Sequence, residues 1–253
     1  MYDLVLENKI IVGTETYSWS DFENSEIITT SINRIDSPIA CIVDGNEISF
    51  KILANMYREK LDGIIIIRSR MTELVYELLI ENGYSIFDSE SRKWIHKSNF
   101  KVVSNRISLL TSGTTGIPKL IHHTWDSINT SGNLKRSEKR NWLLPYQIGT
   151  YAWFQLVSLS MFSNGQKITI CEEVDFVEIF RMAHQHRVDA ISATPTFWRM
   201  AMMQVPKKVL RSIKFRQITL GGEIVDQNIL DSLKSVYPKS RITHIYASTE
   251  AGA

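Results

Sequence analysis

Short apolar runs alternate with helix-like segments along this chain, and this alternation limits its possible folds more than any other feature. Residues 64–67 are apolar throughout, which is typical of a strand covered on both faces of a sheet. Residues 72–82 have apolar side chains at helical spacing, and they begin with a threonine that can cap a helix. Further strand candidates lie at 40–43, 167–171, 190–193 and 217–220. The pattern predicts α/β layers, with mostly parallel sheets flanked by helices.

The loop at 111–119, T-S-G-T-T-G-I-P-K, follows an apolar run and is the segment most informative about function. Its glycines let the backbone approach an anion closely. Its backbone N–H groups, hydroxyls and lysine ammonium supply donors and positive charge. It is not a Walker A loop, because Pro118 separates the last glycine from the lysine. A Ser/Thr/Gly-rich surface turn is the alternative explanation. The residues expected to bind polyphosphate are Thr111, Ser112, Gly113, Thr114, Thr115, Gly116 and Lys119.

Along nearly its whole length this loop resembles the phosphate loop of the adenylate-forming superfamily. That superfamily includes acyl-CoA and aryl-CoA synthetases, luciferases and non-ribosomal peptide adenylation domains. In these proteins the loop holds the β- and γ-phosphates of ATP while a carboxylate attacks the α-phosphorus. The resemblance therefore implies an AMP-forming acid–thiol ligase that uses ATP and Mg²⁺, with Lys119 acting in catalysis.

Two later segments resemble the same family in the expected order. The segment at 246–250 is similar to Y-G-x-T-E, where the aromatic packs on adenine, the threonine touches phosphate and the glutamate helps hold Mg²⁺. The segment at 221–223 is similar to the G-G-E/A turn that borders the adenine. Each segment alone also fits a core residue, a solvated end or a plain turn. The resemblance assigns nucleotide binding to Gly221, Gly222, Glu223, Tyr246, Ala247, Ser248 and Thr249. It assigns catalysis to Thr249 and Glu250, with Glu250 as the metal ligand.

Weaker resemblances point to a substrate pocket. Thr194 lies in a segment similar to the family's x-P-T, beside the acyl pocket. Gln147 stands where the L-P-x-x-H-x-x-G turn commonly has histidine, and a buried amide satisfied by the backbone explains it equally well. The region around Trp153 matches the segment where amino-acid-activating relatives carry an aspartate, and residues 151–155 contain no acid. A buried ammonium without a partner is costly, so a fatty or aryl acid is favoured.

The amino-acid composition limits which cellular compartment and which classes of binding partner are expected. With 29 basic and 27 acidic residues, the charge gives no support to a nucleic-acid or membrane-surface role. Cys41 and Cys171 are far apart and lack C-x-x-C spacing, which fits a reducing cytoplasm. We also expect no signal peptide and no membrane span, since the apolar run at 151–162 is too short. The basic cluster at 135–140 fits a solvated loop, with docking of an acidic carrier domain as the second explanation.

The resemblance also predicts the domain organisation. It implies a shortened N-terminal α/β subdomain at 1–105 and a nucleotide-binding subdomain at 106–253, without the family's C-terminal domain. A fragment of a longer protein is favoured over a natural short form. The predicted function is activation of a carboxylic acid to an acyl-adenylate, with later transfer to a CoA or carrier-protein thiol. The alternative is a non-catalytic nucleotide- or acyl-binding module, or a partner subunit.

Overall fold

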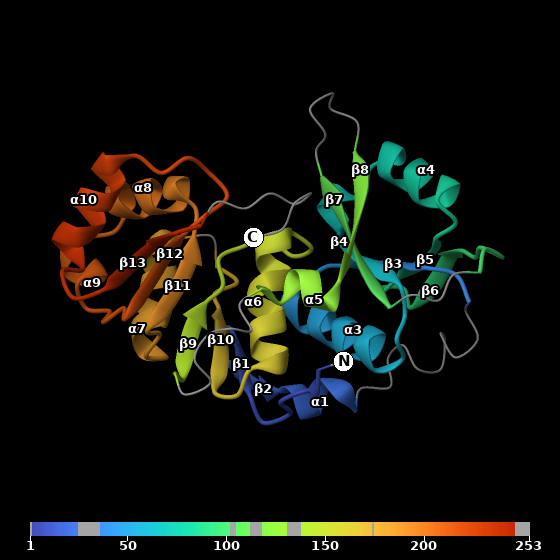
Figure 1. Ribbon diagram of the computed structural model, residues 1–253, viewed down its shortest axis with the longest axis horizontal. Coiled ribbons are helices and arrows are strands. Elements are labelled where there is room, and N and C mark those ends of the chain that lie inside the picture. Colours follow the sequence, from blue (N-terminus) through green and yellow to red (C-terminus); the bar gives the residue numbers. More distant parts are fainter. Residues whose placement is uncertain are drawn as a thin grey trace. The chain divides into compact units, whose positions relative to one another are not determined.

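The computed structural model describes residues 2–24, 36–101, 105–111, 118–130, 138–173 and 175–245, which are coloured in Figure 1. The chain divides into two compact units, each with its own sheet. Unit 1 consists of Met1–Ser18, Ser131–Tyr146 and Leu156–Ala253. Unit 2 consists of Trp19–Thr130 and Gln147–Gln155.

Unit 1 contains a seven-stranded sheet of order β13-β12-β11-β9-β10-β1-β2. Neighbouring strands are parallel except for the antiparallel pair β1 and β2 at one edge. The strands are β1 (Lys9–Val12), β2 (Glu15–Ser18), β9 (Arg140–Leu143), β10 (Gln166–Ile170), β11 (Ala190–Ala193), β12 (Gln217–Leu220) and β13 (Arg241–His244). The strands predicted at 167–171, 190–193 and 217–220 are therefore confirmed as β10, β11 and β12.

Helices connect the parallel strands of unit 1, because a parallel pair needs a long crossover connection. They are α7 (Phe176–Gln185), α8 (Pro195–Gln204), α9 (Lys207–Leu210) and α10 (Gln227–Val236). Asp175, Thr194 and Asp226 cap α7, α8 and α10 by accepting hydrogen bonds from backbone N–H groups of the first turn. The helices bury Phe180 and Trp198 completely in the core of this unit.

Unit 2 contains a six-stranded sheet of order β6-β5-β3-β4-β7-β8. The strands are β3 (Ile39–Val43), β4 (Gly63–Ile67), β5 (Ser85–Asp88), β6 (Lys93–His96), β7 (Arg106–Thr111) and β8 (Lys119–Thr124). The inner strands β5, β3, β4 and β7 are parallel, whereas β6 and β8 pair antiparallel at the two edges. All residues of β3 are buried. The apolar runs at 40–43 and 64–67 are thus confirmed as covered strands.

The helical elements of unit 2 are mostly short. They are α1 (Trp19–Glu23), α3 (Asn46–Arg58), η1 (Arg68–Arg70), α4 (Glu73–Glu81), α5 (Trp125–Ile128) and the first residues of α6 (Tyr151–Phe162). The helix expected at 72–82 is α4, and Thr72 caps it by accepting a hydrogen bond of 3.3 Å from the Val75 amide. The sequence pattern therefore located both ends of this helix.

The predicted α/β class with mostly parallel sheets flanked by helices is confirmed. The two units alternate along the chain, and this differs from the single boundary expected between residues 105 and 106. The reason is strand pairing: β7 pairs with β4 in the sheet of unit 2, while β1 pairs with β10 in unit 1. Within the described part of the chain, no helix has the length and apolar character needed to cross a bilayer.

Candidate functional site

The predicted phosphate loop connects β7 to β8 in unit 2 (Figure 1). The two strands form an antiparallel pair in which Thr111 lies directly opposite Lys119. Ile107, Leu109 and Leu110 anchor β7, because their side chains are buried in the sheet's core. At the mouth of the loop, Thr111 is half-buried and Lys119 is exposed. The fold therefore fixes both ends of the loop on one hairpin.

Many of the residues predicted from the family resemblance lie outside the described residues. They are Ser112, Gly113, Thr114, Thr115, Gly116, Tyr246, Ala247, Ser248, Thr249 and Glu250. Five of these residues, 246–250, come directly after Ile245, which follows β13 in the sequence. Their roles, including a magnesium contact at Glu250, stay predictions.

The hydroxyl of Thr111 is the most informative described group at the loop. Its Oγ1 atom is buried and has no hydrogen-bond partner among the described residues. Leaving a buried hydroxyl unpaired costs about 1–3 kcal/mol, so this position favours a group that completes the bond. Lys119 places an ammonium on the residue directly across the hairpin. A hydroxyl donor and a positive charge on the residues that flank one loop fit the phosphates of ATP.

In unit 1 the predicted residues Thr194, Gly221 and Gly222 lie together at the carboxyl ends of β11 and β12. The Gly221 N–H is 3.4 Å from the carbonyl oxygen of Ala193. A Cβ atom on Gly222 would lie 3.5 Å from Cγ2 of Thr194. Gly222 has a φ of +79°, a left-handed conformation that glycine adopts without strain. Ligands of open α/β sheets bind outside this edge of the strands, so the placement fits nucleotide binding.

Glu223 fastens this turn to the start of α8. Its Oε2 atom accepts hydrogen bonds from the amide (2.9 Å) and the hydroxyl (2.7 Å) of Thr196. Burial raises the pKa of Glu223, but the Thr196 and Thr194 hydrogen bonds and the charge of Arg199 outweigh it and lower the pKa. The carboxylate also lies where the helix dipole favours negative charge. Its position is explained by this anchoring role, and its contact with a nucleotide stays a prediction.

A polar pair that sequence reasoning did not single out extends the same edge. Tyr146 follows β9, and its hydroxyl lies 3.0 Å from the hydroxyl of Ser192 on β11. Burial raises the pKa of Tyr146, although the Ser192 hydrogen bond opposes the increase. Tyr146 therefore stays neutral near pH 7 and can donate a hydrogen bond. Its place directly before Gln147, in the segment similar to the L-P-x-x-H-x-x-G turn, was the signal available in the sequence.

The structure corrects two sequence interpretations in unit 2. Gln147 is exposed, and its backbone carbonyl accepts hydrogen bonds from the amide (3.2 Å) and hydroxyl (2.8 Å) of Thr150. The explanation as a buried amide is therefore wrong, while a substrate contact stays a prediction. Trp153 is completely buried, stacked on Phe50 at 5.7 Å between ring centroids and edge-on to Phe154 at 4.9 Å. A side chain that lines an open pocket keeps exposed surface, so Trp153 belongs to the core instead.

A hydrogen-bonded chain lies across the β7–β8 hairpin. The Tyr84 hydroxyl donates to Ser108 at 2.6 Å, and the Ser108 hydroxyl lies 2.8 Å from Nδ1 of His122. Burial and the charge of Arg106 lower the pKa of His122, which favours the neutral ring. In the described ranges, no three His, Cys, Asp or Glu side chains lie close enough together to hold a metal ion. The hydrogen bonds from Tyr84 through Ser108 to His122 thus link β8 to β7 and stiffen the hairpin that carries the loop.

Comparison with known proteins adds family evidence. A family model described as AMP-binding enzyme matches residues 73–253. The D-alanine–D-alanyl carrier protein ligase of Streptococcus agalactiae serotype III (strain NEM316) is 25% identical over 158 residues. That alignment covers 58% of this chain and 30% of the relative. The counterpart from serotype V (strain ATCC BAA-611 / 2603 V/R) has the same identity and coverage.

Solved structures share the fold. The N-terminal subdomain of Klebsiella oxytoca NpsA, in complex with 3-hydroxybenzoyl-AMSN, gives a TM-score of 0.74 at 17% identity. The match covers 97% of this chain and 69% of that one. The luciferase-like enzyme from the nonluminescent Zophobas morio mealworm gives 0.69 at 14% identity, again covering 97% of this chain and 69% of that one. At these identities the likeness shows the fold alone.

Proposed function

The chain belongs to the AMP-binding enzyme family, and from this premise we propose that it uses ATP to activate a carboxylic acid. In the proposed reaction a carboxylate oxygen bonds to the α-phosphorus of ATP. The bond between that phosphorus and the leaving oxygen breaks, and pyrophosphate departs. The sulfur of a CoA or carrier-protein thiol then bonds to the acyl carbon, the bond from that carbon to the phosphate oxygen breaks, and AMP and the thiol proton are released. The carrier-protein ligase from Streptococcus agalactiae supports the second acceptor.

The observation that carries this proposal is the buried hydroxyl of Thr111, for which the described residues supply no hydrogen-bond partner. We assign Thr111 to hydrogen bonding with a phosphate oxygen, and Lys119 to offsetting phosphate charge. Catalysis of this type depends on holding the reactants in place and neutralising developing charge. A hydroxyl and an ammonium fixed on opposite strands of one hairpin meet that need.

The remaining roles follow from the family resemblance. We assign the backbone of Gly221 and Gly222 to the border of the adenine, and Tyr246 to packing on the base. Thr249 would contact phosphate, and Glu250 would hold Mg²⁺, which supplies positive charge to the phosphates when bound. Gly222 has no side chain, so its backbone can be approached more closely than that of any other residue.

We propose a fatty or aryl acid as the substrate. The first turn of α6 has no acidic residue to pair with an α-ammonium group. The aryl group of 3-hydroxybenzoyl-AMSN, which is bound to the Klebsiella oxytoca subdomain, agrees with this choice. The name of the Streptococcus relative points to an amino acid, so the test must include both classes. We place the reaction in the cytoplasm, because Cys41 and Cys171 are both free thiols.

Acid-dependent exchange of pyrophosphate into ATP tests the proposal. Pools of fatty, aryl and amino acids would be compared in the wild type, Lys119→Ala and Thr111→Val, with Lys93→Ala as the matched control. Lys93 is an exposed lysine on β6 of the same unit. We expect exchange with one pool, a loss of about 100-fold in Lys119→Ala, a smaller loss in Thr111→Val, and no change in Lys93→Ala.

The other outcomes separate the alternatives. Exchange only with amino acids would keep the reaction but overturn the proposed substrate class. Binding of Mg-ATP by calorimetry without any exchange would favour the non-catalytic nucleotide-binding module. Absence of both binding and exchange would contradict the proposal.

A further inference from the structure

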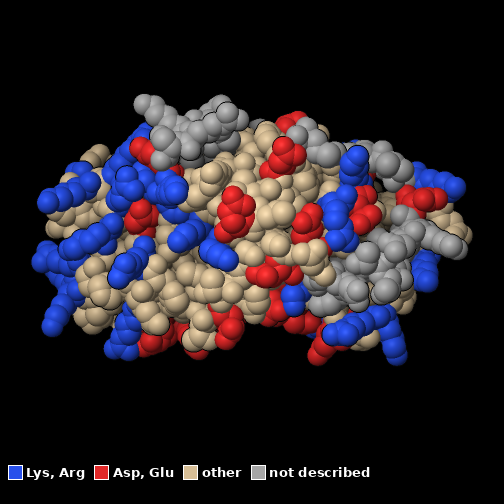
Figure 2. All heavy atoms as spheres, turned by 90° about the horizontal axis from the view of Figure 1, so that it is seen from below, with Lys and Arg blue, Asp and Glu red and all other residues tan. Residues whose placement is uncertain are grey.

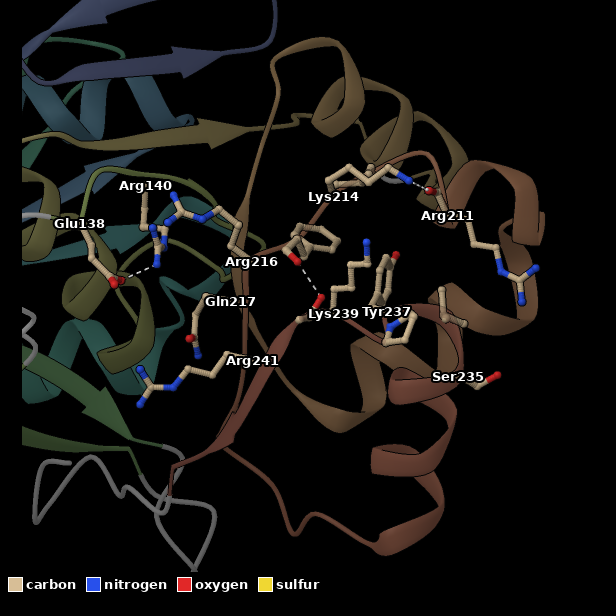
Figure 3. Close-up of a pocket in the computed structure, with 15 residues that line it drawn as sticks. Glu138, Arg140, Arg211, Lys214, Arg216, Gln217, Ser235, Tyr237, Lys239 and Arg241 are labelled. Carbon is tan, nitrogen blue, oxygen red and sulfur yellow. Dashed lines mark hydrogen bonds and ion pairs between the residues drawn. The ribbon is translucent and has the colours of Figure 1, made fainter.

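A cavity of about 940 Å³ lies at the amino-terminal edge of the unit 1 sheet, on the opposite strand edge from Gly221 and Gly222 (Figure 3). The starts of β9, β12 and β13 contribute Arg140, Gln217 and Arg241. The link after α9 and the end of α10 supply the other walls. Arg140, expected in a solvated loop, instead begins β9 and is half-buried.

The charge of this cavity is strongly one-sided. Its basic lining residues are Arg140, Arg211, Lys214, Arg216, Lys239 and Arg241, and its acidic lining residue is Glu138. Arg140 forms an ion pair with Glu138, and Arg216 pairs with Asp189 at 3.5 Å. The other basic groups have no carboxylate partner in the part of the chain that the structure describes. Figure 2 shows Lys and Arg gathered on the left of the view, where α9 and α10 of this unit lie.

A solvated basic surface is the ordinary explanation for such residues, and the helix dipole is a second. α10 ends at Val236, and its C-terminus carries the equivalent of about half a negative charge. One cation balances a charge of that size. The remaining cations repel one another within a concave site, where the field is focused. A bound anion would remove this repulsion.

The floor of the cavity is apolar and rigid. Phe215 and Tyr237 are buried, with their ring centroids 5.2 Å apart. Both rings pack on Trp198, at 5.9 Å and 5.7 Å. The volume is near the upper end of the range of about 300–1,000 Å³ for small-molecule sites. An apolar floor under a basic rim suits an organic molecule with an anionic group.

We propose that this cavity binds a small molecule that carries a di- or triphosphate group. The basic side chains of the rim, of which Lys239 lies between Arg211 and Arg241 in Figure 3, supply charge-assisted hydrogen bonds to the phosphates, and an arginine can form such bonds in pairs. The apolar floor receives the organic part of the ligand. Within unit 1 the cavity lies on the opposite strand edge from Gly221 and Gly222, and it contains none of the residues assigned to ATP, so this inference does not depend on the proposed function. Inorganic polyphosphate and a nucleoside polyphosphate share the required chemistry.

Isothermal titration calorimetry on the full chain tests the inference, with GDP, inorganic tripolyphosphate and guanosine as probes. The variants are Arg211→Gln, Lys239→Gln and Arg241→Gln, with Lys167→Gln as the control. Lys167 is an exposed lysine of the same unit that does not line the cavity. We expect binding of the phosphates but not of guanosine, about tenfold weaker in Lys239→Gln and in one of the two arginine variants, and unchanged in Lys167→Gln. Tighter binding of GDP than of tripolyphosphate would identify a nucleoside polyphosphate, and equal binding the phosphate group alone.

Three results would overturn the inference. The first is that neither phosphate compound binds the wild type at millimolar concentration. The second is that Lys167→Gln weakens binding as much as the cavity variants do. In the third, Lys119→Ala abolishes GDP binding, which would place the ligand at the loop after β7. The substituted cavity side chains are exposed, so all variants should keep the fold of the wild type, with unfolding midpoints close to its own, and circular dichroism checks this.

Discussion

The two edges of the unit 1 sheet use polar residues in opposite ways. At the carboxyl edge Glu223 is bonded to Thr196, and Tyr146 is bonded to Ser192. At the amino edge the cavity side chain of Arg241 and its basic neighbours lack carboxylate partners within the described ranges. The first edge is held in shape by its own hydrogen bonds, while the second holds uncompensated charge. A shaped edge suits orientation of a substrate, and a charged edge suits capture of an anion.

The prediction with the largest expected effect concerns Trp198, whose ring packs beneath the floor of the amino-edge cavity. Trp198 is completely buried in α8, and it contacts the floor of the amino-edge cavity through Phe215 and Tyr237. Trp198→Ala leaves a large hole, so we expect a loss of about 3–5 kcal/mol in the free energy of unfolding. Urea denaturation measures the loss. Met203→Ala on the same helix is the control, since Met203 is 81% exposed; a similar loss in both variants would contradict the structure.

The same substitution at the two edges should have opposite effects. Tyr237 Oη is buried without a hydrogen-bond partner among the described residues, so Tyr237→Phe should stabilise the protein by up to about 1 kcal/mol. Tyr146→Phe removes the hydrogen bond to Ser192 and should destabilise by about 1 kcal/mol. Urea midpoints measured side by side give both signs. A destabilised Tyr237→Phe would show that this hydroxyl is bonded in solution and would weaken the contrast.

The parts of the fold that could be predicted from sequence are those set by neighbouring residues. The isoleucine run of β4 and the Thr72 cap of α4 act within a few positions, so their elements were located closely. The phosphate-loop pattern likewise depends on adjacent residues. Thr111 and Lys119 lie opposite one another where β7 ends and β8 begins, and their roles toward phosphate stay predictions.

The parts that could not be predicted depend on which strands become neighbours. The basic cavity forms because β12 and β13 lie side by side and bring Arg216 and Arg241 to one edge. Neither strand encodes that pairing locally. The prediction that Trp153 lines a substrate pocket was wrong for a related reason, because the sequence alone does not distinguish an aromatic residue of the core from one of a pocket. Its stacking partner Phe50 is distant in sequence.

The carboxyl edge should also respond to pH through Glu223. Hydrogen bonds lower its pKa in the folded state, although partial desolvation of the carboxylate opposes them. Its contribution to the free energy of unfolding is therefore present above the unfolded pKa of about 4.3. That contribution is lost as the pH falls through the folded value. Because the residue is exposed, Glu223→Gln should cost only about 0.5–1 kcal/mol at pH 7. Urea unfolding across this range checks it, with the exposed Glu7→Gln as control. A difference from wild type that does not shrink as the pH is lowered below the unfolded pKa would contradict this role of the charge.

The smallest expected effect on stability compares Arg199, which forms an ion pair, with Arg241, for which the described residues supply no carboxylate partner. Arg241 is exposed and shares its cavity with other cations, so Arg241→Gln should change the free energy of unfolding by less than about 0.5 kcal/mol, in the stabilising direction. Arg199 at the opposite edge pairs with Asp226 at 2.5 Å, and Arg199→Gln should be slightly destabilising. Both shifts in urea midpoint should vanish at about 1 M salt, where the screening length is about 3 Å. Equal signs at low salt would mean that Arg241 has a partner in solution, and the amino edge would then be another internally bonded surface with no excess charge to hold a phosphate.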